Sequence, residues 1–418
     1  MTDGSWVADA PGSGFGLENL PYGAFSTDGE GSRLGVRIGD SILDLGAAAR
    51  AGLLDGTVDD PVAVLGAANL NPLLAHDPAT WARVRARVAD LLGDEANQAA
   101  TAPHLVPCSA ATMHLPFAPG DYVDFYSSIE HASTVGRIFR PDGDPLLPNW
   151  RWVPIAYHGR AGTVVPSGTP VHRPLGQRRP PRGEPPTFGP TEKLDIELEL
   201  GFVVGGASRL GEPIPIGRAE EHLFGVVLVN DWSARDIQAW EYQPLGPFLG
   251  KSFATTVGAW VVPWAALAPY RVAARPQDPP PLPHLALPGE WALDIELRVD
   301  IAGAGAPAEE IVAVNARGLY WSAPQQLAHL TSNGATVRPG DLFASGTISG
   351  EGRAQAGSLL ERTWNGRDPL RLASGVERTF LADGDTVTLR GWAGGDAGSR
   401  PRVDLGTCSG TILPAPAT

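Results

Sequence analysis

The chain has 418 residues, more than one hydrophobic core usually organises, so we expect one large domain and one smaller domain. Its 32 basic and 46 acidic residues give a formal net charge of −14, which repels phosphate backbones and anionic lipids and argues against nucleic-acid and membrane partners. The two cysteines form no CxxC pair, so neither a disulfide scaffold nor a zinc ribbon is expected; a reduced, cytoplasmic setting without an export signal is favoured.

Residues 1 to about 116 are predicted to form a small β-containing module with a helical insertion. Strand-like runs flank Gly39-Asp40 in "RLGVRIGDSILDL", and this turn dipeptide predicts a hairpin. In residues 79–94 apolar side chains recur at helical spacing, at Trp81, Val84, Val88 and Leu91. This spacing predicts an amphipathic helix that packs on a core.

From about residue 117 onward, short apolar runs bounded by glycine and proline predict a mostly β domain with few helices. The expected strands cover residues 195–204, 223–230, 257–262, 292–301, 309–314, 341–347 and 385–392. Two segments, 173–190 and 275–288, are rich in proline. Proline has no backbone N–H to donate to a neighbouring β-strand, so these segments are expected to be loops or extended surface segments.

The segment "GDYVDFYSSIEHASTVGRIFR" gathers polar residues of several kinds within seventeen positions, namely Asp124, Tyr126, His131 and Arg140. A helix that starts at Ser127 or Ser128 would carry His131 in its first turns, beside the strand that delivers Asp124. A lone histidine is usually structural, but these companions favour a functional site.

The segment "DIELELGFVVG" begins with alternating carboxylates. In a strand, Asp195, Glu197 and Glu199 share one face. The face is either solvated, in which case lysine, threonine or serine should be mixed with the acids, or it forms part of a cation site.

The run "LFGVVLVNDWSARDIQAWEY" is a buried-looking strand that ends at Asp231. Ser233 and Asp236 have capping-box spacing and predict a helix start, and Arg235 and Gln238 then share a helix face. Asp231 is either a turn residue or part of a site, since sites are often built where a strand ends.

Nearer the C-terminus, "PGDLFASGTISG" presents Thr347 in a loop after a strand, and "GSLLE" supplies Glu361. A carboxylate that binds an imidazole fixes its tautomer and raises its basicity, which is one possible use of Glu361.

These motifs together resemble the fumarylacetoacetase family over nearly the whole chain. The resemblance rests on "LPYGAFST", "ATMHLP", "GDYVDFYSS", "LLPNW", "YHGRAG", "LDIELELGFVVG", "GEPIPI", "HLFGVVLVNDWSARDIQAWEYQPLGPFLGKSF", "RPGDLFASGTISG" and "GTILPA". It implies an SH3-like N-terminal β domain at residues 1–116, a catalytic β-roll domain at residues 117–418, and a homodimer.

The resemblance also implies a metal centre. The residues that match the family's ligands to a main Ca²⁺ ion are Asp124, Glu197, Glu199 and Asp231, while Asp195 has no assigned role and is either solvated or supports the ligands. All-oxygen ligands suit a hard cation. A second ion, Mg²⁺, is implied near Asp231, Lys251 and Thr255, where Ala254 replaces a frequent glycine.

The reaction implied by the resemblance is hydrolysis of 4-fumarylacetoacetate to fumarate and acetoacetate, the last step of tyrosine catabolism. The implied base is His131, held by Glu361, and the implied oxyanion donors are Arg235, Gln238 and Lys251. The residues implied to position the substrate are Tyr126, Arg140, Gln238, Tyr242, Thr347 and Tyr157. The alternatives are an acylpyruvate hydrolase or decarboxylase of the same superfamily and a non-catalytic metal-binding relative.

Overall fold

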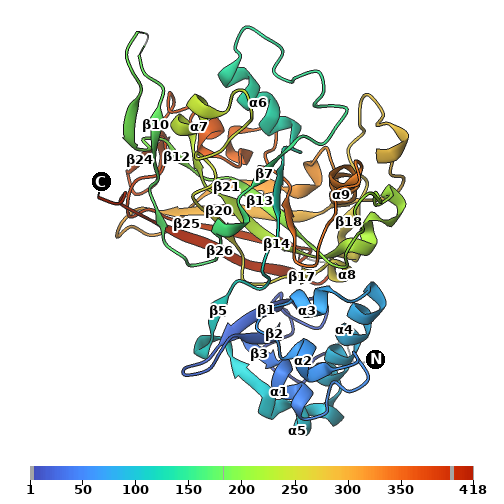
Figure 1. Cartoon of the computed structure of the whole chain (residues 1–418). Coiled ribbons are helices and arrows are strands. Elements are labelled where there is room, and N and C mark those ends of the chain that lie inside the picture. The colour runs from blue at the N-terminus through green and yellow to red at the C-terminus, as the bar shows by residue number, and fades with distance from the viewer. Residues whose placement is uncertain (1–3, 182, 396–399, 418) are drawn as a thin grey trace.

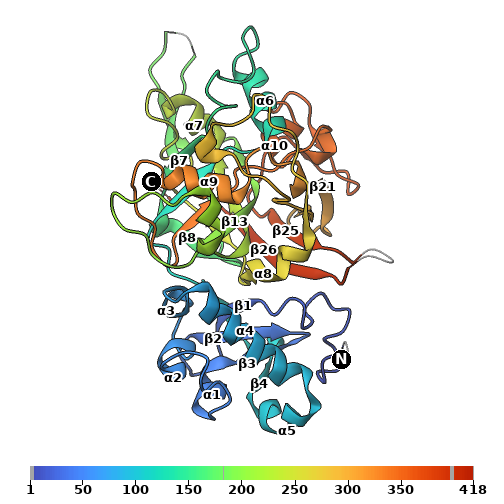
Figure 2. The same cartoon turned by 90° about the vertical axis from the view of Figure 1, so that its right-hand side faces the viewer.

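The computed structural model describes residues 4–181, 183–395 and 400–417, with a smaller N-terminal domain beneath a larger C-terminal one (Figures 1 and 2). The N-terminal domain contains an antiparallel sheet of order β4-β3-β2-β1-β5. Its strands are β1 (Tyr22–Ser26), β2 (Arg33–Ile38), β3 (Ser41–Asp44), β4 (Leu105–Pro107) and β5 (Thr112–His114). Its helices are α1 (Leu45–Arg50), α2 (Pro61–Leu65), α3 (Asn71–Leu74), α4 (Pro78–Gly93) and α5 (Gln98–Thr101).

Two sequence predictions for this domain are confirmed. Strands β2 and β3 pair across the Gly39-Asp40 turn, where Gly39 has a φ of 54°, a left-handed conformation that glycine adopts without a steric penalty. Helix α4 buries Val84 and Val88. Its Trp81 ring reaches the C-terminal domain, packing edge-on against Phe224 at a centroid distance of 5.3 Å.

The C-terminal domain is built on two large sheets. The first has the order β7-β6-β22-β13-β14-β16-β8, with β17 beside β14. Its strands are β6 (Tyr122–Phe125), β7 (Ala156–Gly159), β8 (Val164–Pro166), β13 (Leu198–Val204), β14 (Leu223–Asp231), β16 (Thr255–Val257), β17 (Val262–Pro263) and β22 (Leu342–Ala344). The second has the order β21-β20-β25-β26-β9. Its strands are β9 (Val171–His172), β20 (Ile295–Ala302), β21 (Glu309–Asn315), β25 (Thr386–Ala393) and β26 (Val403–Leu413).

Short strand pairs and helices complete this domain. The pairs are β10 (Leu175–Arg178) with β11 (Thr187–Pro190), β12 (Leu194–Asp195) with β15 (Ser233–Ala234), β18 (Arg271–Val272) with β19 (Ala292–Leu293), and β23 (Leu370–Arg371) with β24 (Glu377–Arg378). The helices are α6 (Ile129–Phe139), α7 (Arg235–Glu241), α8 (Trp264–Leu267), α9 (Ala323–Thr331) and α10 (Leu359–Arg362). In the described part of the chain, no helix is both long and apolar enough to cross a bilayer.

The mostly β prediction is confirmed, but three segments differ from expectation. The strand expected at 257–262 is instead two short strands, β16 and β17, and the strand expected at 341–347 is only the three residues of β22. The proline-rich segment 173–190, whose residue 182 lies outside the described residues, contains the β10–β11 hairpin (Figure 1). Most of its prolines lie in the connection between the strands, where no ladder donor is required.

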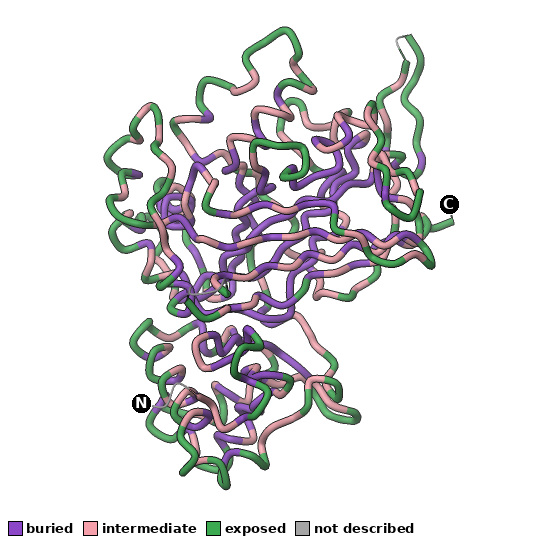
Figure 3. Tube along the Cα trace, turned by 180° about the vertical axis from the view of Figure 1, so that it is seen from behind, coloured by how far each residue is buried: buried purple, intermediate pink, exposed green. Residues whose placement is uncertain are grey.

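Buried residues follow the strands of the larger domain (Figure 3). At the centre of the first sheet the fully buried Phe343 ring lies 6.0 Å from Phe125 and 5.1 Å from Phe202. The rings from neighbouring strands therefore pack into one hydrophobic core, and the same strands carry the polar site.

Replacing Phe343 by alanine is expected to lower the free energy of unfolding by about 3 to 5 kcal/mol, because a large cavity opens among packed rings. Denaturant unfolding followed by tryptophan fluorescence measures this loss. The control is Phe188→Ala at a 67% exposed position on β11, which should change stability by less than about 0.5 kcal/mol. Equal effects of the two substitutions would contradict the assignment of this core.

Candidate functional site

Four carboxylates meet where strands of the first sheet lie side by side. Asp124 comes from β6, Glu199 from β13 and Asp231 from the end of β14, while Glu197 lies just before β13. One oxygen from each of the four lies within 4.8 Å of the others, and all four residues are buried. The sequence-predicted ligands are thus brought together, and the cluster could hold a metal ion.

The unpaired oxygens of this cluster fit a hard cation. Both Glu199 oxygens and Asp124 Oδ1 are buried, and in the described part of the chain they have no hydrogen-bond partner. Burial, followed by repulsion from neighbouring carboxylates, raises the pKa of Glu199 and of Asp124 well above their ordinary values. A buried acceptor without a partner is costly, and a divalent cation would supply the missing partner and offset the repulsion.

Two basic side chains already compensate part of the negative charge. Lys251 Nζ donates to Glu197 and, at 2.7 Å, to Asp231 Oδ2. Arg235 Nη1 lies 2.8 Å from Glu197 Oε1. Burial opposes ionisation of Glu197, but Lys251 and Arg235 outweigh it and lower its pKa. Glu197 is therefore charged, whereas burial raises the pKa of Glu199 and of Asp124 and favours their neutral forms until a cation binds.

Hydroxyl groups hold the carboxylates in place. Tyr157 donates to Asp231 Oδ2 at 2.5 Å, Thr255 donates to Asp231 Oδ1 at 3.2 Å, and Tyr122 donates to Asp124 Oδ2 at 3.1 Å. Sequence reasoning missed Tyr122, although the two-residue spacing between Tyr122 and Asp124 on a strand puts both on one face.

A histidine–glutamate pair lies beside the cluster. Helix α6 begins after Ser128, whose Oγ accepts from the backbone N–H of His131, as the sequence predicted. The imidazole Nδ1 lies 2.6 Å from Glu361 Oε2, and both side chains are almost fully buried. Burial opposes ionisation of Glu361, but His131 and two serine hydroxyls outweigh it and lower its pKa. An ionised carboxylate only accepts, so Nδ1 donates, and in the neutral imidazole the lone pair is then on Nε2.

The two serines are a second feature that sequence reasoning missed. Ser358 Oγ donates to Glu361 Oε2 at 2.7 Å and Ser349 Oγ donates to the same oxygen at 3.0 Å. Ser358 also caps α10 by accepting from the Glu361 backbone N–H. The S-x-x-E spacing in "GSLLE" is a capping-box signature, and it could have identified Ser358.

A cavity of about 910 Å³ opens onto both groups of residues. Its lining includes the predicted residues Asp124, Tyr126, His131, Arg140, Tyr157, Glu197, Arg235, Gln238, Tyr242, Lys251 and Thr347. Three buried polar atoms of this lining, Arg140 Nε, Arg235 Nη2 and Thr347 Oγ1, have no hydrogen-bond partner within the described residues. The cavity therefore offers donors to an oxygen-rich anion.

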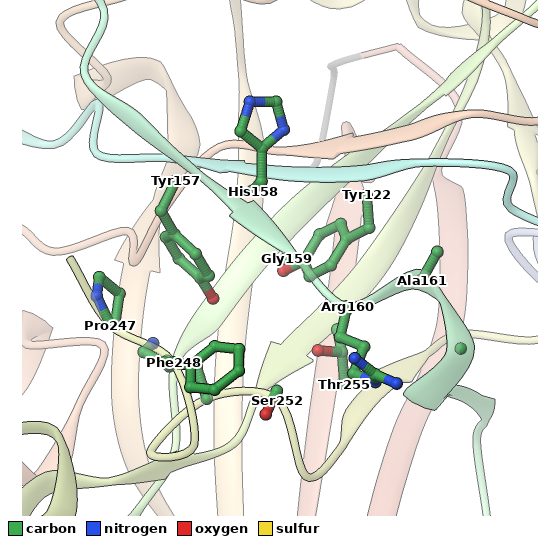
Figure 4. Close-up of a pocket in the computed structure, with 12 residues that line it drawn as sticks. Tyr122, Tyr157, His158, Gly159, Arg160, Ala161, Pro247, Phe248, Ser252 and Thr255 are labelled. Carbon is green, nitrogen blue, oxygen red and sulfur yellow. The ribbon is translucent and has the colours of Figure 1, made fainter. Parts of the chain in front are cut away.

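Figure 4 shows the residues that line a second, smaller cavity of about 380 Å³. The residues that line both cavities are Tyr157, His158, Pro247, Phe248 and Lys251. Thr255 lines only the smaller cavity.

Two sequence expectations near the site are wrong. Ser233 does not cap α7: its Oγ donates to the Asp231 carbonyl, and Asp236 accepts from the Thr191 hydroxyl and the Glu192 amide. Ser233 pairs in β15, so the chain is still extended where a cap would be needed. The solvated alternative for Asp195 also fails, since its side chain is fully buried.

Cation binding at the cluster is expected to release protons, so that the apparent Ca²⁺ affinity rises with pH. Without a cation, Glu199 holds its proton above its ordinary pKa of 4.5, and the ion must displace it. The folded, cation-free protein binds more protons than the unfolded chain, so its stability falls as pH rises through this window. Calorimetric titration in two buffers of different ionisation enthalpy measures the release. An affinity independent of pH, with no proton release, would contradict the raised pKa values.

The chain is similar to known proteins over most of its length. The family model "Fumarylacetoacetase N-terminal" matches residues 18–116, and "Fumarylacetoacetate (FAA) hydrolase C-terminal" matches residues 122–412. Fumarylacetoacetases of Rattus norvegicus and Homo sapiens are each 47% identical over 98% of this chain and 99% of their own length. The enzyme of Arabidopsis thaliana is 44% identical over 99% of both chains.

Solved structures with lower identity share the fold. A fumarylacetoacetate hydrolase from Exiguobacterium antarcticum has a TM-score of 0.53 at 16% identity, covering 94% of this chain and 99% of its own. A maleylpyruvate hydrolase from Sphingobium sp. SYK-6 has a TM-score of 0.50 at 16% identity, covering 95% and 100%. These structures support the fold alone, whereas the family models and the full-length relatives establish that the chain belongs to the fumarylacetoacetase family and is a hydrolase of carbon–carbon bonds.

Proposed function

We propose that the protein hydrolyses 4-fumarylacetoacetate to fumarate and acetoacetate, the last step of tyrosine and phenylalanine catabolism. The observation that carries this proposal is the buried His131–Glu361 pair, which opens onto the same cavity as the four-carboxylate cluster. Hydrolysis of a β-diketone requires an activated water and stabilisation of the negative charge that develops. Both could act on one substrate bound in this cavity.

His131 takes a proton from water in this proposal. Glu361 accepts from Nδ1, so the lone pair on Nε2 is available to the attacking water. The oxygen adds to the carbonyl carbon of the fumaryl arm, giving a tetrahedral alkoxide. The carbon–carbon bond then breaks, its electron pair leaves with acetoacetate as an enolate, and the proton returns to the enolate carbon. A general base of this kind contributes about 10² to 10⁴ in rate.

Arg235, Gln238 and Lys251 are the proposed donors to the alkoxide. Arg235 has one buried nitrogen without a hydrogen-bond partner in the part of the chain that the structure describes. Lys251 uses two of its three N–H donors on carboxylates, which leaves one for substrate. Gln238 Oε1 accepts from Arg235 at 3.1 Å, so its amide N–H₂ is oriented away from that contact. Removing one such donor typically costs about 10² to 10³ in kcat.

The remaining lining residues are proposed to orient the substrate's carboxylates and carbonyls. Arg140 and Thr347 each have a buried polar atom that finds no hydrogen-bond partner among the described residues, which suits an anionic substrate. Tyr126 packs edge-on against the His131 ring at 5.2 Å and, with Tyr242, lines the cavity. Tyr157 donates to Asp231, which favours holding the ligand set over contacting substrate.

We assign Ca²⁺ to Asp124, Glu197, Glu199 and Asp231, where it would chelate the diketone oxygens and stabilise the departing enolate. The oxygen separations of up to 4.8 Å suit Ca²⁺, because its bonds of about 2.3 to 2.6 Å put opposite ligands about 5 Å apart. A Mg²⁺ ion is proposed beside Asp231 with Thr255 and the backbone of Lys251. We further propose a homodimer that works in the cytoplasm.

The proposed function is tested by the loss of ultraviolet absorbance when purified protein meets 4-fumarylacetoacetate, with an acylpyruvate and a β-keto acid as parallel substrates. Faster turnover of 4-fumarylacetoacetate supports the proposal. Preference for the acylpyruvate, or release of CO₂ from the β-keto acid, favours the alternative enzymes. Absence of turnover with all three favours a non-catalytic metal-binding protein.

A further inference from the structure

Asp195 is fully buried, and four donors surround its carboxylate. Oδ1 accepts from the Ile196 and Leu359 amides at 2.8 and 2.7 Å. Oδ2 accepts from the Leu360 amide at 3.0 Å and from Arg235 Nε at 2.8 Å. Within the described residues every contact comes from a donor, and these donors favour the carboxylate form, while burial raises the pKa of Asp195 above its ordinary value.

These contacts reach two parts of the proposed catalytic apparatus. Leu359 and Leu360 open α10, the helix that carries Glu361, and their amides are among the N–H groups that a helix start leaves unpaired. Asp195 therefore fixes the backbone immediately before the carboxylate that orients the base, while Ser358 and Ser349 fix the Glu361 side chain.

The same carboxylate fixes the orientation of Arg235. With Nε bound to Asp195 and Nη1 bound to Glu197 and Gln238, the planar guanidinium cannot rotate about its axis without losing charge-assisted contacts. Among the residues that the structure describes, Nη2 is left as the one buried nitrogen of Arg235 without a partner. The contact with Asp195 thus decides which nitrogen of Arg235 is free for the cavity.

We propose that Asp195 is a positioning residue that holds Arg235 and the Glu361-bearing helix in one fixed arrangement, so that the oxyanion donor and the His131 base act on the same carbonyl. The proposal rests on the proposed function. Asp195 lies outside the four-carboxylate cluster, but Arg235 also binds Glu197 of that cluster, so metal content is measured beside kcat. Small displacements of catalytic groups are costly because the reacting atoms must be aligned.

Asp195→Asn is the first test. It keeps the size of the side chain, but it replaces one carboxylate oxygen, which accepts hydrogen bonds, with an amide NH₂ group that faces the N–H donors around it. We expect kcat to fall about 10²-fold, with KM within about threefold and metal content unchanged. The double variant with Glu361→Gln should lose less kcat than the product of the two single-variant losses, because both substitutions act on the orientation of His131. A merely structural defect would give multiplying losses.

The matched control is Asp385→Asn. Asp385 is equally buried and binds the Arg378 guanidinium through two contacts of 2.8 Å and the Ala382 amide at 2.8 Å. It does not line the catalytic cavity. This variant should lose thermal stability to a similar extent while keeping kcat within about twofold, because it loses a buried ion pair but no catalytic group.

A second variant, Asp195→Glu, keeps the charge and moves the carboxylate by one methylene, so it tests position if Asp195→Asn does not fold. A kcat reduced at least about tenfold at unchanged metal content supports the proposal. Folded, metal-loaded variants with wild-type kcat would overturn it, as would failure of both variants to fold. If the wild-type protein itself does not turn over 4-fumarylacetoacetate, the proposed function fails instead.

Discussion

Replacing His131 by alanine is expected to lower kcat by about 10² to 10⁴, because the water loses its general base. Metal content should not change, since His131 is not among the four clustered carboxylates and an imidazole is a poor ligand for Ca²⁺. A diketo-acid analogue should still bind with an affinity within about tenfold, a change of about 1.4 kcal/mol. Steady-state kinetics, elemental analysis and calorimetric titration of the analogue measure these three quantities.

The matched control for this substitution is His222→Ala. His222 is half-buried and bonded to the Gly205 carbonyl, away from the catalytic cavity, so its removal should leave kcat unchanged. Near wild-type turnover of His131→Ala, or a loss of metal in proportion to activity, would show that His131 is not the base.

Replacing Glu199 by glutamine is expected to weaken Ca²⁺ binding at least about tenfold and to lower turnover with it. The substitution keeps the shape of the side chain but removes a negative charge whose two oxygens have no other partner in the described part of the chain. Activity should recover in part at high Ca²⁺. The cation-free variant should unfold no earlier than the cation-free wild type, because burial raises the pKa of Glu199 and favours its neutral form there, and glutamine is a neutral side chain of the same shape.

Calcium titration of the chelated protein, followed by activity and thermal unfolding, measures both effects. Glu212→Gln, at an exposed position, is the control and should change neither. Full wild-type activity after exhaustive chelation, with no metal detected by elemental analysis, would contradict a catalytic role for the cluster.

The sequence predicted best where local pattern alone determines structure. The turn at Gly39-Asp40, the helical stripe of α4 and the Ser128 cap before His131 depend on neighbours within a few positions, and all three are confirmed. The predictions failed where tertiary contacts override local preference. Ser233 has capping-box spacing, yet it pairs with Asp195 in the β12–β15 ladder, so the helix begins later.

The site itself depends on contacts that spacing cannot reveal. His131 and Glu361 are 230 positions apart, and only the fold shows that they touch. The alternation around Glu197 and Glu199 predicted a shared face, but not that Asp195 would instead bind the start of α10. Buried hydroxyls such as Ser349 left no signal, because an isolated serine in a loop is common.

The proposed function requires this hydrolase to cleave 4-fumarylacetoacetate between its fumaryl and acetoacetate parts. Proton NMR of purified protein with this substrate and Ca²⁺ follows the substrate and both products at once. We expect fumarate and acetoacetate to appear in equal amounts as the substrate disappears, and His131→Ala to form neither at a comparable rate. Persistence of the substrate with wild-type protein, or products other than this pair, would contradict the proposed function.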